Sequence, residues 1–250
     1  PYRNWFRSRF HARGKLVGWE GWDSRNGNLP EFQQTADGDL VPEVSDHIFD
    51  VTTRWMDPNG DGDPSDGIDG WRLDVAPEIG TAFWSRWRTH VRSINPNAAL
   101  YGEIWFDAAP WFSGVAFDAQ MNYPFAYAVV EWASGAPRTS ASALAARLQR
   151  VFNHAPATDL AQMNLLDSHD TARLLTMMAH PGTSYDDGTT SADLGSDSVS
   201  VRPKDEHARR AMLAVALQVA APGSPMIFAG DELGAFGPDD PDNRKPIQWP

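Results

Sequence analysis

An arginine and an aspartate two positions apart interrupt an apolar stretch, "GIDGWRLDVA", that otherwise predicts a buried β-strand. Side chains two apart on a strand point to the same face, so Arg72 and Asp74 lie together. An arginine beside an aspartate favours the ionised carboxylate and fixes its orientation by a charge-assisted hydrogen bond. Asp74 is therefore suited to be a nucleophile, with a structural ion pair as the equal alternative on this motif alone. The opposite face carries Trp71, Leu73 and Val75.

A second carboxyl group, Glu103, stands in the next apolar stretch, "AALYGEIW", with Trp105 on the same predicted face. A carboxyl group beside a large indole is partly desolvated, which favours its protonated form. That is the requirement for a general acid. The alternative is a glutamate at a solvated strand end.

The segment "LLDSHDTAR" places His169 and Asp170 directly after a third apolar strand. A fixed carboxylate there can stabilise positive charge, and the imidazole can donate to a substrate hydroxyl, although a histidine beside an aspartate is a weak motif by itself. Two carboxyl groups in the roles of nucleophile and acid are the minimum for retaining glycoside hydrolysis.

Five short apolar segments predict strands, and helical patterns lie between them. The first helix is predicted where apolar residues recur at steps of three and four, with its apolar stripe facing a core. Further helices are predicted near residues 81–94, 125–132, 140–152 and 205–221, whereas residues 1–39 and 181–197 are predicted to be irregular. The stripe of the first helix consists of Val41, Val44, Ile48, Val51 and Trp55. The strand segments are "IDGWRLDVA", "AALYGEIW", "GVAFDAQMN", "AQMNLLDS" and "SPMIFAGDE".

Strands that alternate with helices predict an α/β fold with parallel strands joined by crossovers. An open doubly wound sheet would give a similar pattern. We favour a (β/α) barrel because four of the strands end in an acidic residue, and barrel active sites lie at the carboxyl ends of the strands.

Composition limits the choice of partner. The 250 residues are 42% hydrophobic, enough for one large domain or part of a larger one. The formal charge of −12 argues against a nucleic acid or an anionic membrane, and no apolar run approaches the roughly 20 residues needed to span a bilayer. The eleven tryptophans can stack on sugar rings, although core packing is their commoner use. The absence of cysteine leaves the redox compartment open.

Four segments, "GIDGWRLDVA", "YGEIW", "NLLDSHDTAR" and "GSPMIFAGDE", resemble in this order the conserved regions of the α-amylase family of glycoside hydrolases. The resemblance implies that Asp74 is the nucleophile of a double displacement, Glu103 the acid/base and Asp170 the transition-state stabiliser. It also implies that Arg72 orients the nucleophile and that His169 binds the sugar next to the scissile bond.

The resemblance further implies that the five strands are about strands four to eight of a (β/α)8 TIM barrel. Residues 1–39 would then be the end of a domain inserted after the third strand, and residues 40–250 a partial catalytic barrel. We expect an excerpt of a longer enzyme, because the chain begins at Pro1 with no methionine or signal-like segment. Its compartment and oligomeric state stay open.

Substrate preference depends on the residues that follow the nucleophile. Many α-amylases have a Lys-His pair where this chain has Pro77 and Glu78. The glutamate is similar to the neopullulanase, cyclomaltodextrinase and maltogenic amylase branch, and we expect Glu78 and Trp105 to contact substrate. We expect hydrolysis of α-1,4-glucans, with cyclodextrin, pullulan or α-1,6 activity, transglycosylation, or a non-catalytic carbohydrate-binding barrel as alternatives. Asp231 and Glu232 are expected to support the end of the last strand.

A cation site is the last expectation. Oxygen ligands alternate with other residues from position 57 to 63, as at the start of a calcium-binding loop. The twelfth position is Ile68, where a full loop of that kind has a glutamate, so a solvated acidic turn is the alternative. We expect no organic cofactor. The candidate ligands are Asp57, Asn59, Asp61 and Asp63.

Overall fold

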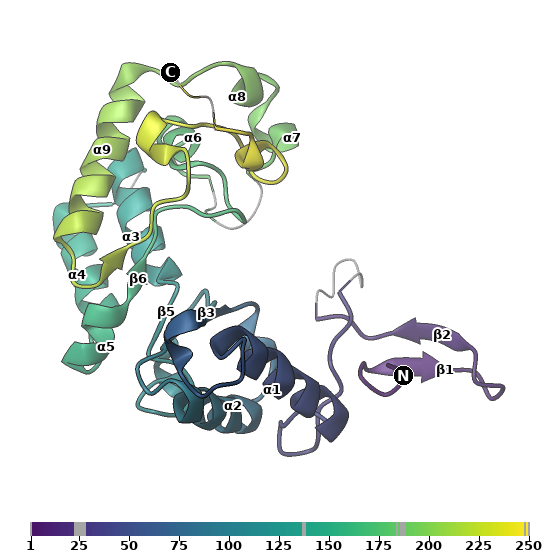
Figure 1. Cartoon of the computed structure of the whole chain (residues 1–250). Coiled ribbons are helices and arrows are strands. Elements are labelled where there is room, and N and C mark those ends of the chain that lie inside the picture. Colours follow the sequence, from purple (N-terminus) through teal and green to yellow (C-terminus); the bar gives the residue numbers. More distant parts are fainter. Residues whose placement is uncertain are drawn as a thin grey trace. The chain divides into compact units, whose positions relative to one another are not determined.

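Two units make up the fold, and each is described by itself. The computed structural model describes residues 2–22, 29–136, 139–183, 185, 189–247 and 249. The first unit contains Pro1–Ile104 and Ala108–Gln120, and the second contains Trp105–Asp107 and Met121–Pro250. Figure 1 shows their helices and strands.

A parallel sheet in the order β3-β4-β5 forms the centre of the first unit. Its strands are β3 (Gly70–Leu73), β4 (Ala99–Gly102) and β5 (Ala119–Gln120), shorter than the apolar segments that predicted them. Arg72 lies opposite Tyr101 in the register of β3 and β4. The strands approach so closely at Gly70 that a Cβ there would lie 2.3 Å from the carbonyl oxygen of Ala99. The strand that carries Arg72 therefore depends on a glycine at its first position.

Helices α1 (Pro42–Met56) and α2 (Thr81–Ile94) pack together in this unit (Figure 1). The predicted bounds of α2 are confirmed. The predicted stripe of α1 is partly wrong, because Val51 and Trp55 are 38% and 59% exposed. The buried face turns instead toward Thr52, whose hydroxyl accepts a hydrogen bond from the indole of Trp87 at 2.9 Å. The buried residues of α1 are Val44, Ser45, Thr52 and Met56.

Aromatic side chains fill the core between these helices and the sheet. Trp84 and Trp87 are both buried and meet edge to face, with ring centroids 5.7 Å apart. The indole of Trp84 also donates to the carbonyl of Ala76 at 2.9 Å, just beyond the end of β3. Both tryptophans pack the core, and Trp84 also anchors the end of the strand.

The N-terminal segment contains an antiparallel pair, β1 (Ser8–Phe10) and β2 (Leu16–Trp19), so the prediction that this whole segment is irregular is wrong. Phe6 and Phe32 form an isolated antiparallel bridge, and their rings stack at 5.2 Å. Three 3-10 turns also belong to the first unit: η1 (Pro64–Asp66), η2 (Ala76–Glu78) and η3 (Ala109–Trp111).

The second unit joins a short parallel pair, β6 (Met163–Asn164) and β7 (Ser224–Pro225), to a group of helices (Figure 1). The predicted helices near residues 125–132, 140–152 and 205–221 are confirmed, whereas α5 and α6 were not predicted. The predicted loop at 181–197 contains α7, and its residues 184 and 186–188 lie outside the described part. The helices are α3 (Tyr123–Ser134), α4 (Ala141–Val151), α5 (Pro156–Ala161), α6 (Leu174–Ala179), α7 (Ser191–Leu194), α8 (Asp197–Ser200) and α9 (Asp205–Ala220). The turns η4 (Asp231–Leu233) and η5 (Asp242–Arg244) follow.

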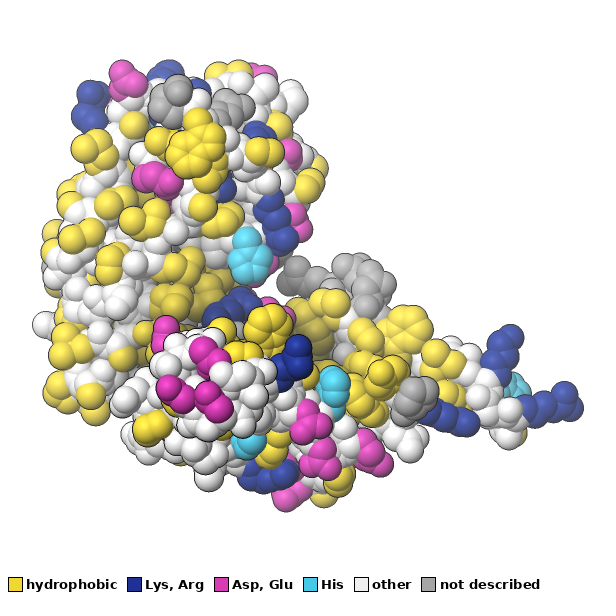
Figure 2. Space-filling model, viewed as in Figure 1, with side chains coloured by type: hydrophobic (Ala, Val, Ile, Leu, Met, Phe, Trp, Pro, Cys, Tyr) yellow, Lys and Arg dark blue, Asp and Glu magenta, His cyan; other side chains and the backbone are white. Residues whose placement is uncertain are grey.

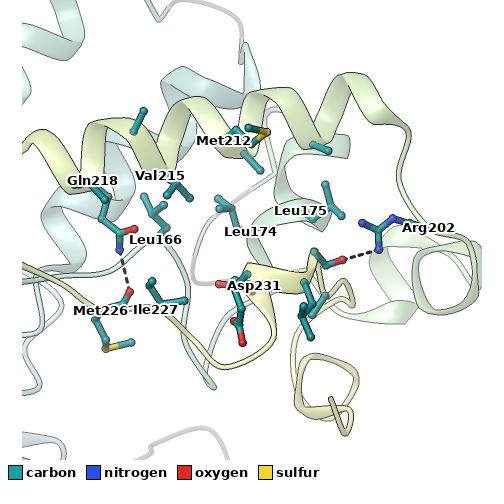
Figure 3. Close-up of a pocket in the computed structure, with 18 residues that line it drawn as sticks. Leu166, Leu174, Leu175, Arg202, Met212, Val215, Gln218, Met226, Ile227 and Asp231 are labelled. Atoms are coloured by element: carbon teal, nitrogen blue, oxygen red, sulfur yellow. Dashed lines mark hydrogen bonds between the residues drawn. The ribbon is translucent and has the colours of Figure 1, made fainter. Parts of the chain in front are cut away.

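Helix α9 leaves much of its apolar surface uncovered within this unit. Met212 and Val219 are 71% and 65% exposed, and hydrophobic side chains gather over this helix in Figure 2. An apolar cavity of about 700 Å³ lies between α9, α6 and the segment after β7 (Figure 3). Among the described residues, no helix has both the length and the apolar character needed to cross a bilayer.

Candidate active site

Strand β3 and the residue after β4 place three of the predicted site residues together. Arg72 lies within β3, Asp74 follows its last residue, and Glu103 follows the last residue of β4. The backbone N–H of Glu103 donates to the carbonyl of Leu73 at 2.9 Å, which fixes the two strand ends side by side.

The guanidinium of Arg72 pairs with both carboxylates. One terminal nitrogen donates to Oδ1 of Asp74, and the other lies 3.0 Å from Oε1 of Glu103. The remaining oxygen of Glu103, Oε2, accepts the backbone N–H of Val75 at 2.8 Å. Glu103 is 5% exposed, whereas the side chain of Asp74 is 74% exposed. One cation therefore holds an open carboxylate and a buried one side by side.

The alternation used to assign these side chains to faces ends earlier than expected. Strand β3 stops at Leu73, and Val75 adopts a left-handed conformation with φ of 46°. Strand β4 stops at Gly102, so the argument that put Glu103 and Trp105 on one face of a strand does not reach either residue. Each strand therefore ends one residue before a carboxylate, and Asp74 and Glu103 lie in the segments that follow the strands.

His169 and Asp170 lie in the second unit, in a turn after β6. The backbone N–H of Asp170 donates to the hydroxyl of Ser168 at 3.1 Å. Nε2 of His169 lies 3.2 Å from Oδ2 of Asp170. The two side chains therefore pair with each other.

A C-terminal segment that the sequence reasoning missed holds this turn. Arg244 lies 3.3 Å from Oδ1 of Asp170 and donates through Nε to the carbonyl of His169 at 3.0 Å. The amide of Asn243 donates to the carbonyls of His169 and Thr171, both at 2.8 Å. Arg244 also pairs with Asp240 at 3.2 Å, and no sequence pattern indicates its contact with Asp170.

A buried charge network lies behind the same turn. Arg173 stacks over the ring of Phe228 at 3.6 Å and pairs with Asp231 at 3.1 Å. Asp231 shares a hydrogen bond with Asp167, which also accepts the backbone N–H of Leu174 at 2.7 Å. Burial, followed by the negative charge of Asp231, raises the pKa of Asp167 well above its ordinary value. Burial is also the main cause that raises the pKa of Asp231.

The two predicted substrate contacts follow the two carboxylates closely in the chain. Glu78 ends the turn η2, and its carbonyl accepts the side chain of Gln34 at 2.8 Å. Trp105 belongs to the second unit, where its ring stacks on Tyr123 with centroids 3.8 Å apart. Glu232 accepts the backbone N–H of Gly230 at 2.9 Å, in the turn that also holds Asp231.

The candidate calcium loop is an exposed turn held by its own backbone. Asp57 accepts the N–H groups of Gly60 and Gly62, both at 2.9 Å, and Asp61 accepts that of Asp63 at 2.8 Å. The amide of Asn59 donates to Asp61 at 3.1 Å. Within the described ranges, no three acidic or histidine side chains are grouped to hold a metal ion. As arranged, these carboxylate oxygens accept hydrogen bonds from the backbone of the loop itself.

The apolar cavity beneath α9 belongs to the second unit. Leu174, Met212, Val215 and Ile227 are among its lining residues, with Asp231 at its edge (Figure 3). The described lining includes none of Asp74, Glu103 or Asp170. A polar sugar would gain little in such a cavity.

Parallel strands followed by helices, with acidic side chains at the strand ends, define a mixed α/β fragment consistent with part of a TIM barrel. Residues 28–249 match the family described as "Alpha amylase, catalytic domain". The chain belongs to the α-amylase family.

Individual relatives agree with this assignment. Neopullulanase 2 from Thermoactinomyces vulgaris is 39% identical over 212 residues, covering 83% of this chain and 30% of the relative. The type III pullulan hydrolase from Thermococcus kodakarensis has a TM-score of 0.76 at 29% identity, covering all of this chain and 39% of that one. A cyclic α-maltosyl-(1→6)-maltose hydrolase from Arthrobacter globiformis, in complex with its namesake sugar, has a TM-score of 0.69 at 28% identity and covers 99% and 48%. The chain spans about a third or less of the length of the curated relatives it matches.

Proposed function

We propose that this chain carries the catalytic carboxylates of a retaining glycoside hydrolase that cleaves α-1,4-glucosidic bonds in starch, maltodextrins or related α-glucans. The observation that carries the proposal is the pairing of Arg72 with both Asp74 and Glu103 in a member of the α-amylase family. The ion pair orients Asp74 while leaving its carboxylate open to a substrate.

In the proposed reaction, Glu103 gives its proton to the glycosidic oxygen as Asp74 attacks the anomeric carbon. Water then attacks the glycosyl-enzyme, and Glu103 takes the proton of that water. Two inversions give retention of the α-anomer. Asp170 stabilises the positive charge that develops on the sugar ring, and His169 donates to a sugar hydroxyl.

We also propose that the strands correspond to about the fourth to the eighth of a (β/α)8 barrel, and that residues 1–39 end an inserted domain. The support is the parallel order of β3, β4 and β5 and the coverage of half or less of each related chain. Calcium at the loop containing Asp57 stays a prediction, which a chelator tests by the melting temperature of the full-length protein.

A second candidate activity is cleavage of cyclodextrin, pullulan or α-1,6 bonds. It is favoured by Glu78 in place of the histidine of many α-amylases and by relatives named for pullulan or a cyclic α-1,6-linked sugar. We propose that the side chain of Glu78 contacts the sugar on the leaving-group side. Trp105 is the aromatic residue that we propose to contact the substrate.

Product analysis of the full-length protein on starch, pullulan, cyclodextrin and sucrose tests these proposals together. Maltooligosaccharides released from starch with the α-anomer formed first support the α-1,4 proposal, and longer products than the substrate indicate transglycosylation. The non-catalytic alternative gains support if a folded protein binds these sugars and changes none of them. Asp74→Asn should abolish turnover and leave binding largely intact.

A further inference from the structure

The residue after the candidate nucleophile has a backbone conformation that its side chain opposes. Val75 has φ of 46° and ψ of 42°, in the left-handed region where a β-branched residue is a genuine outlier. Among the described residues, the other non-glycine residue with positive φ is Ser113. Strain of this kind persists where the surrounding structure over-determines it, often at a functional site.

The strained turn aims one backbone group at a carboxylate. The N–H of Val75 donates to Oε2 of Glu103 at 2.8 Å. The carbonyl of Val75 accepts the N–H of Glu78 at 3.1 Å, which begins the turn η2 directly after the strand. With the guanidinium of Arg72 lying 3.0 Å from Oε1, both oxygens of Glu103 are paired with groups of the segment that carries Asp74.

We propose that Val75 is a positioning residue: its left-handed backbone points an N–H at Glu103 and holds this carboxyl group in register with the nucleophile Asp74. The inference rests on the proposed function, which makes Glu103 the proton donor. It adds a residue whose contribution is a backbone amide rather than a side chain.

The proposed role affects protonation of the leaving sugar by Glu103 more than attack by Asp74 on the anomeric carbon. When the bond to the leaving sugar breaks, the proton of Glu103 goes to the glycosidic oxygen and Asp74 forms its bond to the anomeric carbon. A misplaced Glu103 therefore slows the departure of a sugar alcohol. Fluoride leaves without such help, so an α-glycosyl fluoride needs Asp74 but depends little on Glu103.

The experiment compares kcat/KM for maltotriose and α-maltosyl fluoride in the full-length protein. Val75→Gly keeps the N–H and removes the Cβ that opposes positive φ, since glycine adopts this conformation without strain, so both values of kcat/KM should stay within about twofold. Replacing valine 75 by its α-hydroxy analogue makes the bond an ester and removes only the N–H. In this ester variant we expect kcat/KM for maltotriose to fall by about tenfold or more, against less than about twofold for the fluoride.

Ser113→Gly is the matched control, because Ser113 has φ of 59° in the same unit and lies exposed on its surface. It should leave both values of kcat/KM unchanged. Equal losses on the two substrates in the ester variant, or no loss, would overturn the positioning role. A wild-type protein that cleaves neither substrate would overturn the proposed function and this inference with it.

Discussion

The guanidinium of Arg72 lies 3.0 Å from Glu103, the proposed acid/base, while it also pairs with the proposed nucleophile. The sequence predicted only the second pairing, because Arg72 and Asp74 lie two positions apart in a segment predicted to be a strand. The first arises from the parallel register of β3 and β4, which brings the residue after β4 to the side of Arg72. One arginine thus connects both carboxylates of the proposed displacement.

Arg72→Lys should lower kcat much more than it raises KM. A lysine keeps the charge but cannot present two nitrogens in a fixed plane to two carboxylates, so we expect a loss of about a hundredfold in kcat. Steady-state kinetics on maltotriose measures this. Arg88→Lys is the control, because Arg88 pairs with Asp118 at 2.8 Å away from the proposed chemistry, and it should leave kcat within about twofold. Equal effects of the two changes would contradict the account.

Gly70→Ala should destabilise the first unit. Its Cβ would meet backbone atoms of Ala99 at 2.3 to 3.0 Å, so β3 and β4 would have to separate. We expect about 2 kcal/mol or more of lost stability. Gly60→Ala provides the comparison, because its φ is also unfavourable for alanine but nothing lies within 4 Å, and it should cost about 1 kcal/mol. Denaturant titration of both variants gives the difference.

Asp167→Asn should flatten the dependence of stability on pH. The raised pKa of Asp167 means that the folded protein binds this proton more tightly than the unfolded chain does. The stability it contributes is present below its ordinary pKa and is lost as the pH rises through the folded value. Asparagine resembles the protonated acid in shape and can keep the bond from Leu174, so the loss should be smaller in the variant.

Melting temperatures at about pH 5 and about pH 8 measure this effect. Asp205→Asn, at an exposed position in the first turn of α9, is the control and should keep the wild-type dependence. A variant at position 167 with the same pH dependence as the wild type would show that this proton is not linked to folding.

Arg244→Gln should reduce kcat with little effect on stability. The pair with Asp170 is partly exposed, with side-chain exposures of 46% and 34%, so its loss should cost about 1 kcal/mol or less. The proposed stabiliser would nevertheless lose the cation that orients it. Arg147→Gln, which breaks a similarly exposed pair with Glu131 on the surface of the second unit, should change neither quantity appreciably. A large fall in melting temperature with kcat unchanged would make Arg244 a structural residue.

The sequence predicted regular elements best where local signals and packing agree. Helix α2 has the predicted bounds because Thr81 follows Gly80 and the helix stops before Pro96, which disfavours helical geometry in the residue that precedes it. The stripe of α1 was partly wrong because Thr52, a polar residue, is buried by its bond to Trp87, and hydrophobicity alone does not reveal such a partner.

The candidate carboxylates could be predicted from the sequence, but the groups that hold them could not. Asp74 and Glu103 stand at the ends of apolar segments, and this position and the family resemblance make them candidates, although strand alternation reaches neither residue because β3 ends at Leu73 and β4 at Gly102. The amide of Val75 and the side chain of Arg244 act through a backbone turn and a contact distant in sequence, and neither leaves a periodic pattern. Only the folded arrangement shows them.

The central claim is that Asp74 forms the covalent glycosyl-enzyme, and trapping that species tests it most directly. The full-length protein would be incubated with a 5-fluoro-α-glycosyl fluoride, digested with trypsin and sequenced by mass spectrometry. The account predicts a sugar adduct on Asp74 in the peptide Leu73–Arg86. An adduct on Glu103 or Asp170, or release of the β-anomer from an α-glucan, would contradict it.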